Sequence, residues 1–126
     1  MSEKAGSVSR KRAKNAGGPT DPQPDSEDKG IVMRVHRRGS EIVIAACDEE
    51  LLGRVLKIGS RTYEISSSFY GSLKVENETL LIHLRQATMA NLLGERTVRL
   101  AVKAGVVEQD ATSHLDGVLH AEMVCL

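Results

Sequence analysis

Two β-branched runs separated by a Gly-Ser pair constrain the fold of this chain more than any other feature. The runs are Ile31–Arg38 and Glu41–Cys47, and Gly39 and Ser40 separate them. Glycine at the first position of a two-residue loop favours a type II′ turn, whose twist suits a β-hairpin. This register sets Arg38 opposite Glu41, a favourable cross-strand pair. A slip by one residue would turn the charged face inward, so the sequence predicts a hairpin with one register.

Alternation along this hairpin separates a hydrophobic face from a basic face. The side chains predicted to enter the core are Ile31, Met33, Val35, Ile42, Ile44 and Ala46. Arg34, His36 and Arg38 lie together on the other face, toward solvent. Arginine presents a rigid fork that suits phosphate, which makes this face a candidate nucleic-acid contact. The alternative interpretation of the same pattern is a solvated strand face with no binding role.

The rest of residues 30–126 combines short strands, turn signals and helical periodicity. The predicted elements are a helical turn at Asp48–Gly53, a hairpin over Leu56–Ile58 and Arg61–Ile65, an irregular loop at Ser66–Gly71, a helix beginning at Asn77 and continuing through Thr88, a break near Asn91–Gly94, a helix over Glu95–Ala104, and a last hairpin turning at Asp116-Gly117. We therefore expect a small α+β domain with an antiparallel or mixed sheet built from hairpins and two or three helices on one face.

Residues 1–29 differ in composition from this domain. All three prolines lie there, and no large hydrophobic residue occurs between Val8 and Ile31. Such a segment cannot bury enough apolar surface to offset its ordering entropy, so it is predicted to be a disordered polar tail. Its basic residues are Arg10, Lys11, Arg12 and Lys14. They would either assist phosphate binding or simply keep the chain soluble.

Composition excludes several classes of protein. The 126 residues carry 17 Lys and Arg against 17 Asp and Glu, so no global field attracts a polyanion. No stretch approaches the roughly 18 apolar residues of a membrane helix. Two cysteines, Cys47 and Cys125, are too few for a disulfide scaffold or a zinc knuckle. We predict no cofactor, no metal site and no catalytic residue.

Two further groups of residues are candidate sites. Arg96, Arg99 and Lys103 share one face of the second predicted helix, and they form a second basic stripe whose position relative to the first is open. Phe69 and Tyr70 are two of only three aromatic residues and lie together in a Ser/Gly loop. They are a candidate protein contact, or they fold back into the core.

Four ordered segments resemble the archaeal family called domain of unknown function 424. They are Ala45–Gly53, Ser68–Gly71, Ala87–Arg96 and Gly117–Ala121. The resemblance spans about Gly30 to Val124 and implies a small α+β domain of archaeal type, but it assigns no catalytic residues. Leu119 stands where the family pattern has proline, which implies a less rigid turn before His120.

The leading hypothesis is a non-enzymatic cytoplasmic binding module for structured RNA or the ribosome, acting through both basic stripes. The first alternative is a protein-interaction adaptor that uses the loop with Phe69 and Tyr70. The second alternative is a small-molecule enzyme or sensor centred on Cys47, Asp48 and His120. It requires those three side chains to converge, and the acidic residues after Cys47 disfavour a thiolate. The partner and the oligomeric state are left open.

Overall fold

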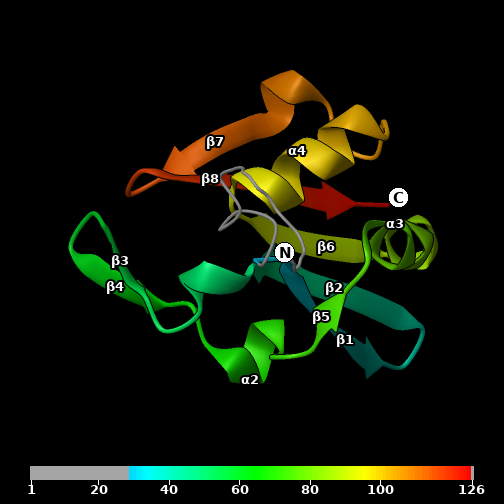
Figure 1. The fold of residues 1–126 in the computed structure, drawn as a ribbon, viewed down its shortest axis with the longest axis horizontal. Coiled ribbons are helices and arrows are strands. Elements are labelled where there is room, and N and C mark those ends of the chain that lie inside the picture. Colours follow the sequence, from blue (N-terminus) through cyan, green and yellow to red (C-terminus); the bar gives the residue numbers. More distant parts are fainter. Residues whose placement is uncertain (1–28, 126) are drawn as a thin grey trace, which may run out of the picture.

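In the computed structural model, which describes residues 29–125, the chain builds a six-stranded sheet and a separate two-stranded hairpin (Figure 1). The elements are β1 (Ile31–Arg38), β2 (Glu41–Asp48), η1 (Glu49–Leu51), β3 (Val55–Ile58), β4 (Arg61–Glu64), α2 (Ser67–Tyr70), β5 (Lys74–Val75), α3 (Asn77–Gln86), β6 (Met89–Leu93), α4 (Glu95–Lys103), η2 (Gln109–Ala111), β7 (Thr112–Leu115) and β8 (Val118–Val124). The strand order is β5-β1-β2-β6-β8-β7; β2 and β6 are parallel and the other neighbouring pairs antiparallel. The predicted α+β class is confirmed, and the sheet is mixed.

The opening hairpin forms in the predicted register. Arg38 pairs with Glu41, and φ is 61° at Gly39. Among the described non-glycine residues φ is positive only at Asp116, so Ser40 has the negative φ that a type II′ turn requires. The last hairpin is also confirmed, because Asp116 and Gly117 both have positive φ, as in a type I′ turn.

The segment after α3 differs from the prediction. Residues 87 and 88 were expected to continue the helix and 91–94 to form a break, but α3 ends at Gln86 and Met89–Leu93 forms β6. This strand lies between β2 and β8 and contributes to the cores on both sides of the sheet. A strand with apolar side chains on both faces shows no clear polar alternation, so its short apolar run cannot be distinguished from a helix by periodicity.

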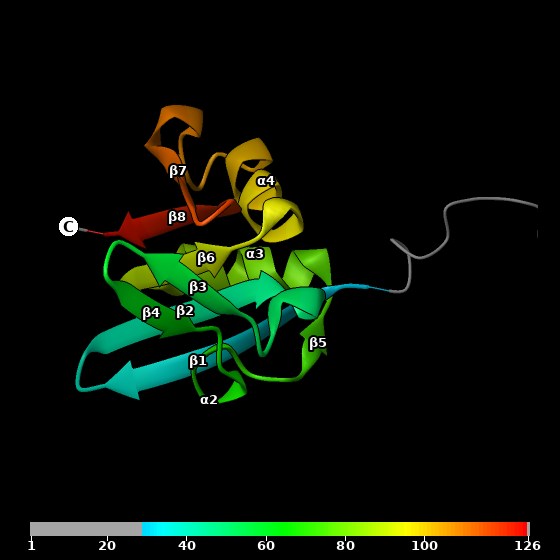
Figure 2. The ribbon, with the colours of Figure 1, turned by 90° about the vertical axis from the view of Figure 1, so that its left-hand side faces the viewer.

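Both faces of the sheet are covered, by different elements. Helices α3 and α4 pack on one face through Leu80, Leu84, Val98 and Ala101. The β3–β4 hairpin and α2 cover part of the opposite face through Leu56, Ile65 and Tyr70 (Figure 2). The predicted loop at residues 66–71 is therefore a one-turn helix, with Ser66 accepting a hydrogen bond from the backbone N–H of Phe69. We call this second side the hairpin face.

None of the helices in the described part of the chain is long and apolar enough to cross a bilayer. The basic cluster at residues 10–14 lies outside the described residues.

Candidate functional site

The hairpin face is covered at one end and open at the other. At the covered end Cys47, Leu93 and Val118 are buried beneath β3–β4 and α2. At the open end the surface forms a groove of about 740 Å³. Its lining residues are Arg34, Val35, His36, Arg37, Arg38, Glu41, Val43, Phe69 and Met89. We call this surface the sheet groove.

The wall of the sheet groove is made where α2 docks on β1. The ring of Phe69 stacks on that of His36, with centroids 5.0 Å apart and planes at 23°. His36 Nε2 is 2.8 Å from the carbonyl oxygen of Phe69, and Arg34 Nη1 donates to the carbonyl of Ser68 at 3.1 Å. Gly71 allows this close docking, because it has φ 82° and a Cβ there would lie 2.7 Å from a β1 carbonyl. These contacts join an aromatic pair to a basic strand.

The floor of the sheet groove combines cations with exposed apolar side chains. Arg34 and Arg38 are exposed, whereas His36 is half-buried. Met89 is 43% exposed and pairs across the sheet with Val124, which is 56% exposed. The carboxylate of Glu41 accepts a hydrogen bond from Thr88 Oγ1 at 2.8 Å. The groove therefore offers guanidinium groups, a stacked aromatic pair and apolar surface within one concavity.

A smaller pocket of about 200 Å³ lies on the same face, between the β3–β4 hairpin and the sheet. We call it the tyrosine pocket; its lining residues are Ile58, Tyr63, Tyr70, Asn91, Leu93, Leu115, His120 and Glu122. The hydroxyls of Tyr63 and Tyr70 are 2.9 Å apart, and Tyr70 donates to Asn91 Oδ1 at 3.0 Å. Burial raises the pKa of Tyr70, with a further contribution from its bond to Tyr63. Burial also lowers the pKa of His120, against a smaller opposing effect of Glu122.

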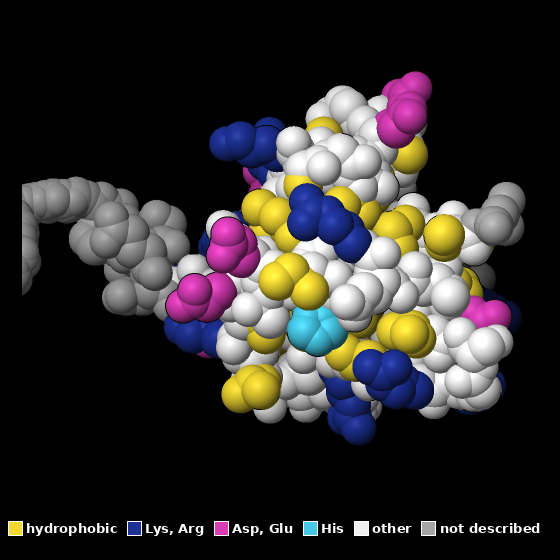
Figure 3. All heavy atoms as spheres, turned by 90° about the vertical axis from the view of Figure 1, so that its right-hand side faces the viewer, with side chains coloured by type: hydrophobic (Ala, Val, Ile, Leu, Met, Phe, Trp, Pro, Cys, Tyr) yellow, Lys and Arg dark blue, Asp and Glu magenta, His cyan; other side chains and the backbone are white. Residues whose placement is uncertain are grey.

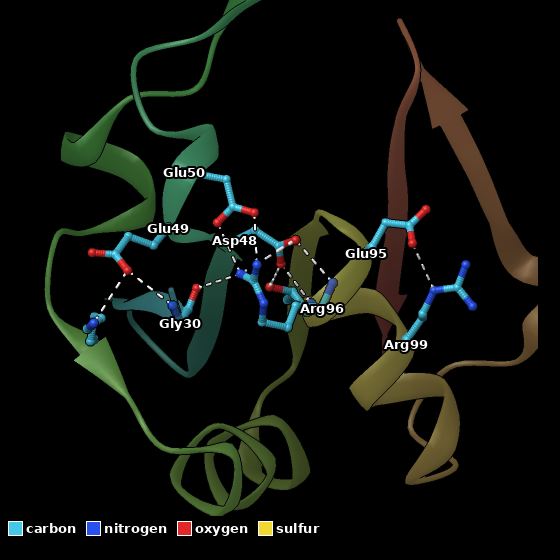
Figure 4. Close-up of polar contacts among 9 residues, drawn as sticks. Gly30, Asp48, Glu49, Glu50, Glu95, Arg96 and Arg99 are labelled. Carbon is cyan, nitrogen blue, oxygen red and sulfur yellow. Dashed lines mark hydrogen bonds and ion pairs between the residues drawn. The ribbon is translucent and has the colours of Figure 1, made fainter. Parts of the chain in front are cut away.

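A third cluster lies at the N-terminus of α4 (Figure 4). Asp48 accepts hydrogen bonds from the backbone N–H groups of Arg96 and Thr97 at 3.1 and 2.9 Å, and from Thr97 Oγ1 at 2.8 Å. Arg96 forms a bidentate pair with Glu50 at 3.1 and 2.9 Å and donates to the Gly30 carbonyl at 3.0 Å. This pair lowers the pKa of Glu50 and raises that of Arg96. The cluster borders a cleft of about 450 Å³.

The two predicted basic stripes do not share a surface. Arg96 binds the carbonyl of Gly30, just before β1, whereas Arg38 is the last residue of β1. The eight extended residues of β1 place these two ends about 26 Å apart. Arg96 belongs to α4, which packs on the face opposite the sheet groove. Arg99 pairs with Glu95 at 3.1 Å, and Lys103 is exposed at the end of α4. Arg34, His36 and Arg38 are therefore brought together, and the α4 cations are separate from them.

The residues of the two alternative hypotheses are divided between the two faces. Tyr70 is fully buried and Phe69 is half-buried, so only Phe69 reaches the surface. Cys47 and Asp48 are neighbours on β2, so their side chains point to opposite faces and do not converge with His120 on one site. Burial and the neighbouring acidic residues raise the pKa of the Cys47 thiol to about 12. Both cysteines are free, and residues 29–125 hold no group of three metal-ligating side chains.

Sequence reasoning missed the roles of Asp48 and Asn91. Asp48 was expected to serve its own helical turn, but it caps α4 instead. One signal was present: Gly94 stands at the N-cap of α4 and has no side chain to accept a hydrogen bond, so another group must do so. Asn91 was placed in a break and not in a strand, so its contact with Tyr70 had no visible signal.

Comparisons with known proteins identify a family but no activity. The sequence model of the family described as "Protein of unknown function (DUF424)" matches residues 36–126. The crystal structure of an uncharacterized conserved protein from Methanopyrus kandleri is similar, with a TM-score of 0.66 and 33% sequence identity over 75% of this chain and 90% of that chain. A search of curated proteins finds no match.

Proposed function

The chain belongs to the DUF424 family, and within it we propose that this protein is a cytoplasmic, non-enzymatic binding module that holds an unpaired segment of RNA in the sheet groove. The observation that carries the proposal is the stacked pair of His36 and Phe69 beside the exposed guanidinium groups of Arg34 and Arg38. Phosphates attract arginine, and an aromatic pair can continue a stack of bases.

An unpaired segment suits this site better than a duplex. Sequence-tolerant single-strand sites combine a basic groove with aromatic side chains on which bases stack, and the sheet groove contains both. Its exposed apolar floor at Met89 provides further contact area for a base. A duplex hides its base faces and would use only the cations. Unpaired segments of ribosomal RNA are therefore the first probes to use.

The proposal uses the cations of β1 and not those of α4. Arg96 is held by Glu50 and by the Gly30 carbonyl, so three of its five N–H donors are already engaged. A site with two arginine–phosphate contacts has a shallow salt dependence, because each contact on a single strand contributes about 0.7 to the slope of log K against log salt. We expect a slope of about 1.4 in magnitude from these two arginines.

The test is fluorescence anisotropy with a labelled single-stranded RNA at low and moderate salt. Replacing both Arg34 and Arg38 by alanine should weaken binding about fivefold for each contact at low salt and reduce the slope by about 1.4. Arg85→Ala is the matched control, because it removes an exposed arginine from α3 on the opposite side of the sheet. The side that carries α3 mixes basic, acidic and hydrophobic side chains (Figure 3).

Two results would overturn the proposal. One is negligible affinity of the wild-type protein for any single-stranded RNA at low salt, and the other is equal weakening by the control. If a single protein partner instead persists after nuclease treatment and is lost in Phe69→Ala, the adaptor hypothesis replaces this one. Thermal unfolding of each variant, followed by circular dichroism, verifies that it is folded.

A further inference from the structure

The tyrosine pocket has a fixed order of hydrogen-bond donors and acceptors. A hydroxyl carries one proton, and Tyr70 gives its proton to Asn91 Oδ1. The proton between the two tyrosines must therefore come from Tyr63. This leaves lone pairs on the Tyr63 oxygen as an acceptor. The side-chain N–H groups of Asn91 are left as donors that make no hydrogen bond to another residue in the range 29–125.

Other lining groups add acceptors at the mouth of the pocket. Glu122 is exposed and pairs with Asn91 across β6 and β8, so its side chain lies on the same face and lines the pocket. His120 is half-buried, and burial favours its neutral ring, which offers one donor and one acceptor. Ile58, Leu93 and Leu115 supply apolar walls. The pocket thus presents a donor at Asn91 and an excess of acceptors around it.

The size and position of the tyrosine pocket limit its occupant. Its volume of about 200 Å³ is below the roughly 300–1,000 Å³ usual for drug-sized ligands, so it takes a single small group. Asn91 follows Met89 by two residues on β6, and Met89 lines the sheet groove. Alternate residues of a strand share a face and lie about 7 Å apart. The pocket and the groove are therefore neighbouring parts of one surface.

From this arrangement we propose that the tyrosine pocket receives one nucleobase from the RNA in the sheet groove, cytosine or adenine, each of which has an exocyclic amino group beside an unprotonated ring nitrogen on its Watson–Crick edge. The inference rests on the function proposed above. Such a base offers a ring nitrogen that accepts from Asn91, and an amino group that donates to Tyr63 or Glu122. Uracil has a carbonyl in place of the amino group and a ring N–H in place of the acceptor. The ring N–H of uracil would then face the N–H donors of Asn91, and its carbonyl oxygen would face the acceptors Tyr63 and Glu122.

Cytidine and uridine are the sharpest probes, because they differ only at the positions that the pocket would read. We expect cytidine to shift the backbone amide resonances of β6 and β8 in a nuclear magnetic resonance titration, and uridine to bind about tenfold or more weakly. An RNA of cytidines should likewise bind more tightly than one of uridines. Equal affinity for the two nucleosides overturns the inference.

Asn91→Asp tests the donor directly. This change keeps an oxygen for Tyr70 but replaces the free N–H groups by a second acceptor, so cytidine affinity should fall at least about tenfold. Asn77→Asp is the matched control, since it makes the same change at the exposed first residue of α3. If both variants bind cytidine as the wild type does, Asn91 does not read the base and the inference fails.

The two proposals fail in different ways. RNA binding that depends on Arg34 and Arg38 but does not distinguish cytidine from uridine overturns the base pocket and supports the sheet groove. Cytidine binding in the pocket without measurable RNA affinity overturns the RNA function and supports the pocket as a nucleobase site.

Discussion

Replacing Asp48 by alanine is expected to lower the free energy of unfolding by about 2–5 kcal/mol, more than a surface substitution can. The Asp48 carboxylate is buried and accepts two backbone N–H groups of α4 and the hydroxyl of Thr97. Loss of an N-cap costs about 1–2 kcal/mol. The hydroxyl of Thr97 is buried, and leaving its donor unpaired costs about 1–3 kcal/mol more.

Urea unfolding followed by circular dichroism measures this loss, because the chain has no tryptophan for fluorescence. Asp48→Asn should cost less, about 1–2 kcal/mol, since both bonds from Thr97 end on Oδ1 and are kept, whereas the bond from the Arg96 N–H and the ion pair of Oδ2 with Arg96 Nη1 at 3.9 Å are lost. Glu95→Gln is the matched control, because it alters a carboxylate of α4 that is exposed and that, within residues 29–125, pairs only with Arg99. If Asp48→Ala changes the stability by no more than this control, the carboxylate does not hold α4 and the reasoning is wrong.

Three further predictions concern buried positions. Cys47 should resist alkylation at pH 8 in the folded protein while Cys125 reacts, because Cys47 is buried and its pKa is raised to about 12; modification of both at equal rates would contradict this. In the unfolded chain the pKa of the Cys47 thiol is near 9.0, so the free energy of unfolding falls as pH rises from 9.0 toward 12, by up to about 1.4 kcal/mol per pH unit. Cys47→Ala should reduce this dependence of stability on pH. Gly94→Ala should destabilise more than Gly59→Ala in urea unfolding, because both have positive φ but only at Gly94 would a Cβ overlap the capping carboxyl. Equal effects would exclude that overlap.

The sequence predicts the elements whose signals are local. The two hairpins with Gly-Ser turns, the hairpin with Asp-Gly and the helix of residues 95–103 all carry their turn or cap residues beside them. Strand β6 has no such signal. Its partner β2 is parallel and lies about 45 residues earlier in the chain, so only the assembled sheet distinguishes it from the end of a helix.

The candidate site likewise has parts that local sequence signals predict and parts that only the assembled fold determines. Alternation along the first hairpin is enough to place Arg34, His36 and Arg38 on one face, because a strand has a fixed period. His36 and Phe69 are 33 residues apart in the sequence, and their contact depends on a one-turn helix that the Ser-rich segment does not predict. Whether two basic stripes meet is likewise a property of the topology, which places them on opposite faces of the sheet.

A mismatch of strand lengths explains why one end of the hairpin face is open. The four-residue strands of the β3–β4 hairpin span about 13 Å, whereas the eight-residue strands β1 and β2 span about 26 Å. The short hairpin covers the end that holds Leu93 and Val118, where its own Leu56 is buried. The one-turn helix α2 extends this cover only as far as His36. Beyond it nothing described shields the sheet, so the arginines, the aromatic pair and Met89 border an open concavity, which is the geometry that a binding surface requires.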